Sequence, residues 1–108
     1  ALGSSTTVGG RTSSITLLGA AAVNGHLSLV KELLKRGASV NLPSSLGCTA
    51  LLGAAVHGYH SILLVLLHHS ANPDLQSNVG GTALMAAADY GHEACVKALL
   101  RAKANPDL

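Results

Sequence analysis

Residues 80–92 read GGTALMAAADYGH, and a closely related stretch, GCTALLGAAVHGY, stands 33 positions earlier at residues 47–59. A third version, SITLLGAAAVNGH, occupies residues 14–26. When the alignment is extended to the second half of each copy, nine columns are identical in all three. Chance would give about one such column or fewer at this composition. The chain is therefore read as three copies of one structural unit.

The first half of each copy predicts a short helix. Thr82 is a good N-cap, because a threonine hydroxyl accepts a hydrogen bond from a free amide of the first helical turn. Leu84 and the pair Ala87-Ala88 then fall on one side of the helix, where small residues let a neighbouring helix approach closely. Gly91 stands where a helix of about eight residues must end, and glycine tolerates the left-handed conformation of such an end.

The second half of each copy predicts a second helix. The pair Leu99-Leu100 continues an apolar stripe at spacings of three and four residues, which is typical of a helix with one buried side. Between the copies, Pro43, Pro73 and nearby glycines exclude a helix and favour a hairpin-like turn. The six helices expected on this basis cover residues 17–24, 27–36, 50–57, 60–69, 83–90 and 93–102.

No single helix pair can bury its apolar face alone, but stacked pairs share a continuous core. The composition fits this arrangement, because 48% of the residues are apolar while Trp and Phe are absent. We therefore expect an all-α repeat solenoid of stacked helix-turn-helix units with hairpin-like turns between them. Its parts are a low-complexity flank or remnant of a preceding turn (1–13) and three repeats (14–46, 47–79 and 80–108), the third cut short at its C-terminal end.

The pattern resembles the ankyrin repeat, whose consensus runs G-x-T-P-L-H-x-A-A, then G-H, a Leu-Leu pair and G-A-D-V-N. The matching text is GCTALLGAA at 47–55 and GGTALMAAA at 80–88, followed by GH at 91–92; the last element matches GASVN at 37–41. The resemblance covers residues 14–108. It implies a solenoid fold and a non-catalytic module that binds other proteins.

Three columns depart from that consensus, and these changes bear on stability more than on fold. They are the proline column (Leu17, Ala50, Ala83), the histidine column (Gly19, Leu52, Met85) and the acidic column after Gly-Ala (Ser39, Asn72, Asn105). In the histidine column, the hydrogen bonds usually made by the histidine are lost.

In ankyrin arrays, partners bind on the concave surface made by the turn tips and the exposed side of the first helices. The resemblance thus implies a protein or peptide partner, bound by part of an intracellular scaffold or regulatory protein of the cytoplasm or nucleus. Tyr90 is the expected anchor, since aromatic residues are enriched at binding hot spots. The partner-binding positions so implied are Ser45, Leu46, Cys48, His57, His69, Asn78, Val79, Asp89 and Tyr90.

Two other roles stay open. The chain could be an interior spacer of a long array, or a regulatory segment attached to an enzyme elsewhere in a parent protein. The third copy stops where a further turn would start, so we expect a piece of a longer array. Leu64 and His68 stand where the first copy has Lys31 and Lys35, which leaves the helix at 60–69 apolar nearly all round and suggests a second, self-associating interface there.

Other function classes find little support. The net charge is only +2, too balanced for a polybasic nucleic-acid arm. Glycine-free apolar runs such as residues 62–67 are far shorter than the ~20 residues of a membrane span. The six histidines form no metal motif with Cys or carboxylate partners. No catalytic set or phosphate loop is recognisable, so we expect no enzyme activity, cofactor or metal. Cys48 and Cys95 are expected to be reduced thiols of an intracellular protein.

Overall fold

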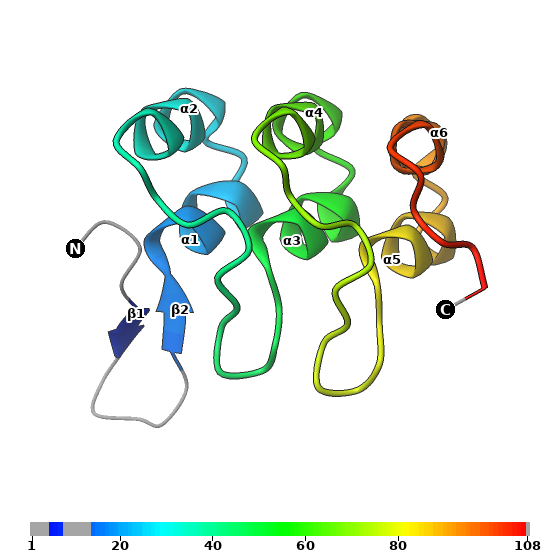
Figure 1. The fold of residues 1–108 in the computed structure, drawn as a ribbon, viewed down its shortest axis with the longest axis horizontal. Coiled ribbons are helices and arrows are strands. Elements are labelled where there is room, and N and C mark those ends of the chain that lie inside the picture. Colours follow the sequence, from blue (N-terminus) through cyan, green and yellow to red (C-terminus); the bar gives the residue numbers. More distant parts are fainter. Residues whose placement is uncertain (1–4, 8–13, 108) are drawn as a thin grey trace.

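The computed structural model describes residues 5–7 and 14–107, which form six helices in two parallel rows (Figure 1). The turns between repeats project beyond the first row, away from the second row (Figure 1). The first row holds α1 (Leu17–Val23), α3 (Ala50–His57) and α5 (Ala83–Asp89), and the second holds α2 (Leu27–Lys35), α4 (His60–His68) and α6 (Glu93–Arg101).

All six predicted helices are present, and the all-α repeat fold is confirmed. Five of them end one residue earlier than predicted, because the last predicted residue is the C-cap, whose amide still bonds back into the helix. The threonine caps are also confirmed. The hydroxyls of Thr16, Thr49 and Thr82 accept hydrogen bonds from the amide three residues later, at 2.8, 3.3 and 3.2 Å.

The turns between repeats are closed by backbone hydrogen bonds, as the Pro and Gly pattern predicted. The Ser44 amide donates to the Cys48 carbonyl at 2.9 Å, and the equivalent bond joins Ser77 to Gly81 at 2.8 Å. Each turn therefore folds back on itself and ends directly before the threonine cap of the next helix.

A short two-stranded sheet precedes α1. β1 (Ser5–Thr7) pairs antiparallel with β2 (Ser14–Thr16), with Ser5 opposite Thr16. The remaining residues of the 1–13 flank, which was expected to be a low-complexity segment or the remnant of a preceding turn, lie outside the part of the chain that the structure describes.

The core lies between the two rows and between neighbours in the first row. Ala22 and Ala55 are fully buried, which lets α1, α3 and α5 pack side by side. Leu51, Leu63 and Leu66 fill the space between the rows in the middle repeat. Thus each repeat completes the core of its neighbours, as expected for a solenoid.

The end of each second helix is followed by a left-handed residue. Gly37 holds this position after α2 with a φ of 90°, but Ser70 and Lys103 occupy it in the next two repeats with φ values of 67° and 65°. A side chain with a Cβ adopts this conformation at a cost of about 1–2 kcal/mol. Replacing Ser70 with glycine should therefore raise the free energy of unfolding by about 1 kcal/mol, measured by urea denaturation followed by circular dichroism.

Ser61 provides the matched control for this change, because it is also exposed but lies inside α4. There, glycine should lower stability by about 0.5–1 kcal/mol. If Ser70→Gly destabilised the chain as Ser61→Gly does, backbone strain at residue 70 would be ruled out.

Candidate protein-binding groove

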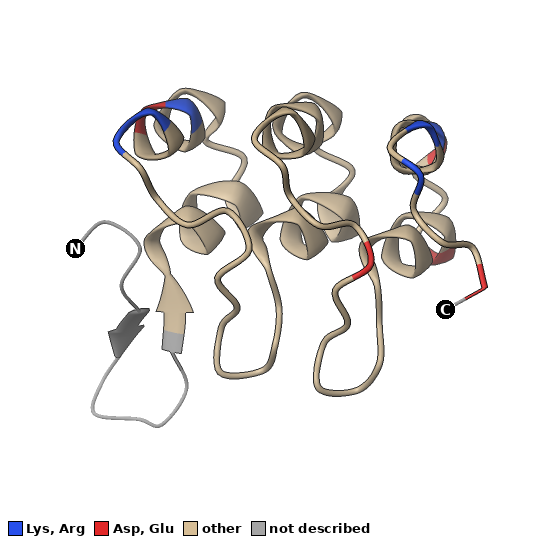
Figure 2. Cartoon of the chain, viewed as in Figure 1, with Lys and Arg blue, Asp and Glu red and all other residues tan. Residues whose placement is uncertain are grey.

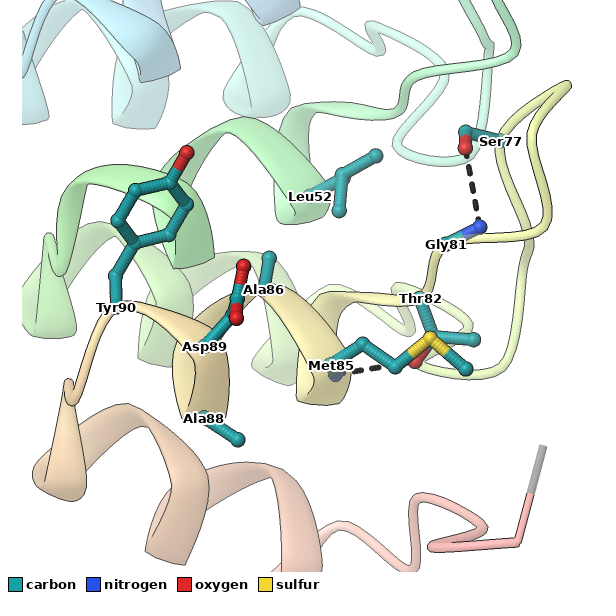
Figure 3. A pocket seen from close by; sticks show the side chains of 9 residues that line it. All are labelled: Leu52, Ser77, Gly81, Thr82, Met85, Ala86, Ala88, Asp89 and Tyr90. Atoms are coloured by element: carbon teal, nitrogen blue, oxygen red, sulfur yellow. Dashed lines mark hydrogen bonds between the residues drawn. The ribbon is translucent and has the colours of Figure 1, made fainter.

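An open groove with a volume of about 730 Å³ runs along α5, from the turn that precedes this helix to its C-terminal end (Figure 3). We call it the α5 groove. It is lined by Leu52, Ser77, Gly81, Thr82, Met85, Ala86, Ala88, Asp89 and Tyr90.

The helical period of α5 explains which residues line the groove. Ala83 and Ala87, four residues apart, are buried on one side of the helix. Met85 and Asp89 share the same spacing on another side and are exposed. Leu52, which is half-buried on the neighbouring α3, completes the wall. The groove is therefore mostly apolar and contains one carboxylate.

Tyr90 closes one end of the groove as an exposed but supported ring. Its side chain is 62% exposed and stacks on His92, with ring centroids 6.2 Å apart and an interplanar angle of 20°. The His92 ring is itself fixed, because its Nε2 donates a hydrogen bond to the Val56 carbonyl at 3.0 Å. The His92 ring thus connects the backbone of α3 to the Tyr90 ring.

The middle repeat has the same ring pair with the residue types exchanged. His57 occupies the column of Tyr90, and Tyr59 occupies the column of His92. The two rings stack with centroids 5.5 Å apart. The C-terminal ends of α3 and α5 therefore both present a supported ring at the surface.

The predicted turn tips lie at the surface and are joined to each other. Leu46 is 64% and Val79 95% exposed. The amide and side-chain Nδ2 of Asn78 donate to the carbonyls of Leu46 and Ser45, at 2.9 and 3.1 Å. Successive tips are thereby held at a fixed spacing.

A family model for three consecutive ankyrin repeats matches residues 17–108. The chain belongs to the ankyrin repeat family. Ankyrin repeats are generally protein–protein interaction modules without catalytic activity. None of the curated proteins compared with the chain matches it.

The predicted ankyrin contact residues fall into separate groups. Asp89 and Tyr90 line the α5 groove, whereas His69 lies after α4 in the second row and donates from Nδ1 to the Val65 carbonyl at 2.9 Å. In the second interface suggested for α4, His68 is exposed but Leu64 is half-buried and packs against the core. That second interface stays a prediction.

Both thiols of this ankyrin unit are free. Cys48 is half-buried, and its amide donates to the Ser44 hydroxyl at 3.2 Å. Cys95 is only 1% exposed, and its burial raises the pKa of the thiol. The Cys95 side chain therefore stays protonated near neutral pH and acts as a small apolar core residue.

Charge is unevenly distributed over the second row of the ankyrin stack. The Lys and Arg residues that the structure describes lie on α2 and α6 or directly after them, whereas α4 contains no Lys, Arg, Asp or Glu (Figure 2). Within residues 5–7 and 14–107, no three His, Cys, Asp or Glu residues lie close enough to hold a metal ion. None of the described helices has the length and apolar character needed to cross a membrane.

The apolar part of the groove lining, formed by Leu52, Met85 and Ala86, was not predicted from the sequence. The signal was present, because Leu52 and Met85 stand in the histidine column of the ankyrin consensus. Leu52 and Met85 cannot make the hydrogen bonds of the consensus histidine, but they supply apolar surface beside the predicted anchor Tyr90.

Proposed function

We propose that this ankyrin unit binds a segment of another protein in the α5 groove, with Tyr90 as the anchor. The observation that supports this most strongly is the Tyr90 ring, which is 62% exposed and yet stacked on a histidine that is bonded to the core. An aromatic ring held in place before binding loses little conformational entropy when a partner covers it.

The lining of the groove indicates the chemistry of the partner. Leu52 and Met85 offer apolar surface, and Met85 is 41% exposed. Asp89 supplies the only charged side chain among the described lining residues. We therefore expect a segment with one or two large apolar side chains next to a lysine or arginine.

The binding mechanism follows from the rigidity of the scaffold. Stacked helices hold the groove, and the Asn78 hydrogen bonds hold the turn tips beside it. The partner meets a preformed surface, as in other repeat proteins with extended binding faces. The two free thiols support a location inside the cell, where cysteines remain reduced.

A random peptide library displayed on phage tests this proposal, because such a selection requires no candidate partner. Selection on the intact chain should enrich peptides that combine apolar residues with a Lys or Arg. Tyr90→Ala should weaken the enriched peptides at least tenfold, since loss of a hot-spot aromatic typically costs about 2 kcal/mol or more. Isothermal titration of the synthetic peptides measures this change.

Leu64→Lys is the control, because it alters the outer helix α4 and introduces the residue that Lys31 and Lys97 place in the same column. It should leave peptide affinity unchanged. Peptides that lose affinity with Leu64→Lys but not with Tyr90→Ala would refute the proposal that the partner binds in the α5 groove. A library that yields no binder would favour the spacer role instead.

A further inference from the structure

The second row of helices carries an excess of positive charge. The Lys and Arg residues that the structure describes are all exposed and all lie on α2 and α6 or directly after them (Figure 2). They are Lys31, Lys35, Arg36, Lys97, Arg101 and Lys103. The only carboxylates that the described part of these helices contains are Glu32 and Glu93, so this group has a net charge of +4.

The helical period places these cations on the side of the row that faces away from the core. Lys31 and Lys35 are four residues apart and therefore stand together on α2, whereas Leu33 on the opposite side of the helix is buried. Lys97 and Arg101 occupy the same two columns on α6. We call this side of α2, α4 and α6 the basic outer face.

Only part of this charge is balanced by ion pairs within the described residues. Arg36 Nε lies 2.7 Å from Glu32 Oε2, and Lys97 Nζ lies 3.8 Å from Glu93 Oε2. The other four cations make no ion pair with a described residue: Lys31, Lys35, Arg101 and Lys103. The basic outer face can therefore attract an anionic partner through these four side chains.

The helix between the two groups of cations adds no negative charge. α4 contains neither Asp nor Glu, and Leu64 stands in the column of Lys31 and Lys97. The other described carboxylates lie on α5 or in turn segments: Asp74, Asp89 and Asp107. An anionic partner would thus meet no repelling group as it crosses from α2 over α4 to α6.

The arrangement of the cations indicates the kind of partner. Because α4 separates the cations of α2 from those of α6, a partner that contacts both must carry negative charge across the full width of the row. The surface of an anionic lipid bilayer has this property, and each nearby Lys or Arg strengthens binding to it about fivefold. None of these three helices contains a Phe, Tyr or Trp on which the bases of a single-stranded nucleic acid could stack.

We propose that the basic outer face binds the surface of an anionic lipid bilayer, with α2, α4 and α6 lying along the headgroups. The turns between repeats project away from this row (Figure 1). The contact uses none of the residues that line the α5 groove, so bilayer binding and peptide binding make separate predictions.

Co-sedimentation of the chain with lipid vesicles tests the proposal. With vesicles made of equal parts of phosphatidylserine and phosphatidylcholine, four unpaired cations should bind half of the chain at a lipid concentration of about 1 mM. The chain should not sediment with vesicles of phosphatidylcholine alone. Salt at about 1 M should release it from the anionic vesicles, because charges are then screened beyond about 3 Å.

Three variants test whether the face, rather than the net charge, determines binding. Lys31→Gln removes a cation from the basic outer face and should weaken vesicle binding about fivefold. Val79→Asp lowers the net charge by the same amount at a turn tip that is 95% exposed, and it should leave the vesicle affinity unchanged. Leu64→Lys adds a cation in the middle of the face and should strengthen vesicle binding about fivefold.

Several results would overturn the proposal. They are a wild-type chain that does not bind anionic vesicles at about 1 mM lipid, equal binding to both kinds of vesicle, and equal effects of Lys31→Gln and Val79→Asp. Binding of duplex DNA or polyglutamate without binding of vesicles would also overturn it and would assign the face to a nucleic acid or an acidic protein. Affinity for the library-selected peptides should be the same in Lys31→Gln and the wild type, so a failure of this proposal is distinguishable from a failure of the α5 groove.

Discussion

Replacing Leu66 with alanine should lower the free energy of unfolding by about 2–5 kcal/mol, the range for deleting a fully buried leucine side chain. Leu66 has no exposed surface, and it belongs to α4, which packs against both α2 and α6. Domains of this size are stable by only about 5–15 kcal/mol, so the loss would be a large part of the total.

The position of Leu66 also determines how the chain should unfold. In a repeat protein, stability is approximately the sum of repeat terms and neighbour-interface terms. A cavity in the middle repeat weakens both interfaces, and neither outer repeat can bury its core alone. We therefore expect one cooperative transition at a lower denaturant midpoint, followed by circular dichroism in guanidinium chloride.

Leu46→Ala is the control, because that leucine is 64% exposed at a turn tip. Its effect should stay within about 0.5 kcal/mol. If the two variants unfolded at the same midpoint, the core between the helix rows would not be where the structure places it.

Much of the fold could be predicted because each structural feature has its sequence signal in all three repeats. Thr16, Thr49 and Thr82 share a column, and all three cap a helix. Helix ends were placed one residue too far in most cases, because the C-cap residue still bonds into the helix and carries no distinct sequence signal.

The α5 groove was less predictable, because it depends on which columns of neighbouring helices meet. The ankyrin resemblance placed Asp89 and Tyr90 on the partner face, and the structure places both in one groove. Leu52 and Met85 come from different repeats, and their joint exposure follows from the packing of α3 beside α5. The stacking of Tyr90 on His92 likewise depends on the orientation of the two rings, which cannot be read from the aligned sequence.

Gly58→Ala should be far more destabilising than Gly91→Ala, although the two glycines share a column and have nearly equal φ values of 71° and 72°. The left-handed conformation costs a residue with a Cβ about 1–2 kcal/mol. Both alanine variants should lose this much stability. At Gly58 the new methyl group would also stand 2.8 Å from Cε1 of His92. Displacing that ring should cost about 1–3 kcal/mol more.

Urea denaturation of both variants measures the difference in stability, and the double variant Gly58→Ala/His92→Ala tests whether the His92 ring causes it. With the ring removed, the methyl group has room, so the two changes should cost less together than the sum of their separate effects. Strict additivity would contradict a contact between residues 58 and 92.

Displacement of the His92 ring should also change peptide binding in the α5 groove. A methyl group at Gly58 would displace the His92 ring, which is bonded to the Val56 carbonyl and stacks on Tyr90. Gly58→Ala should therefore weaken library-selected peptides at temperatures where the variant is still folded, whereas Gly91→Ala, which moves no described side chain, should not. Equal peptide affinities for the two variants would mean that Tyr90 does not need His92 to hold its position.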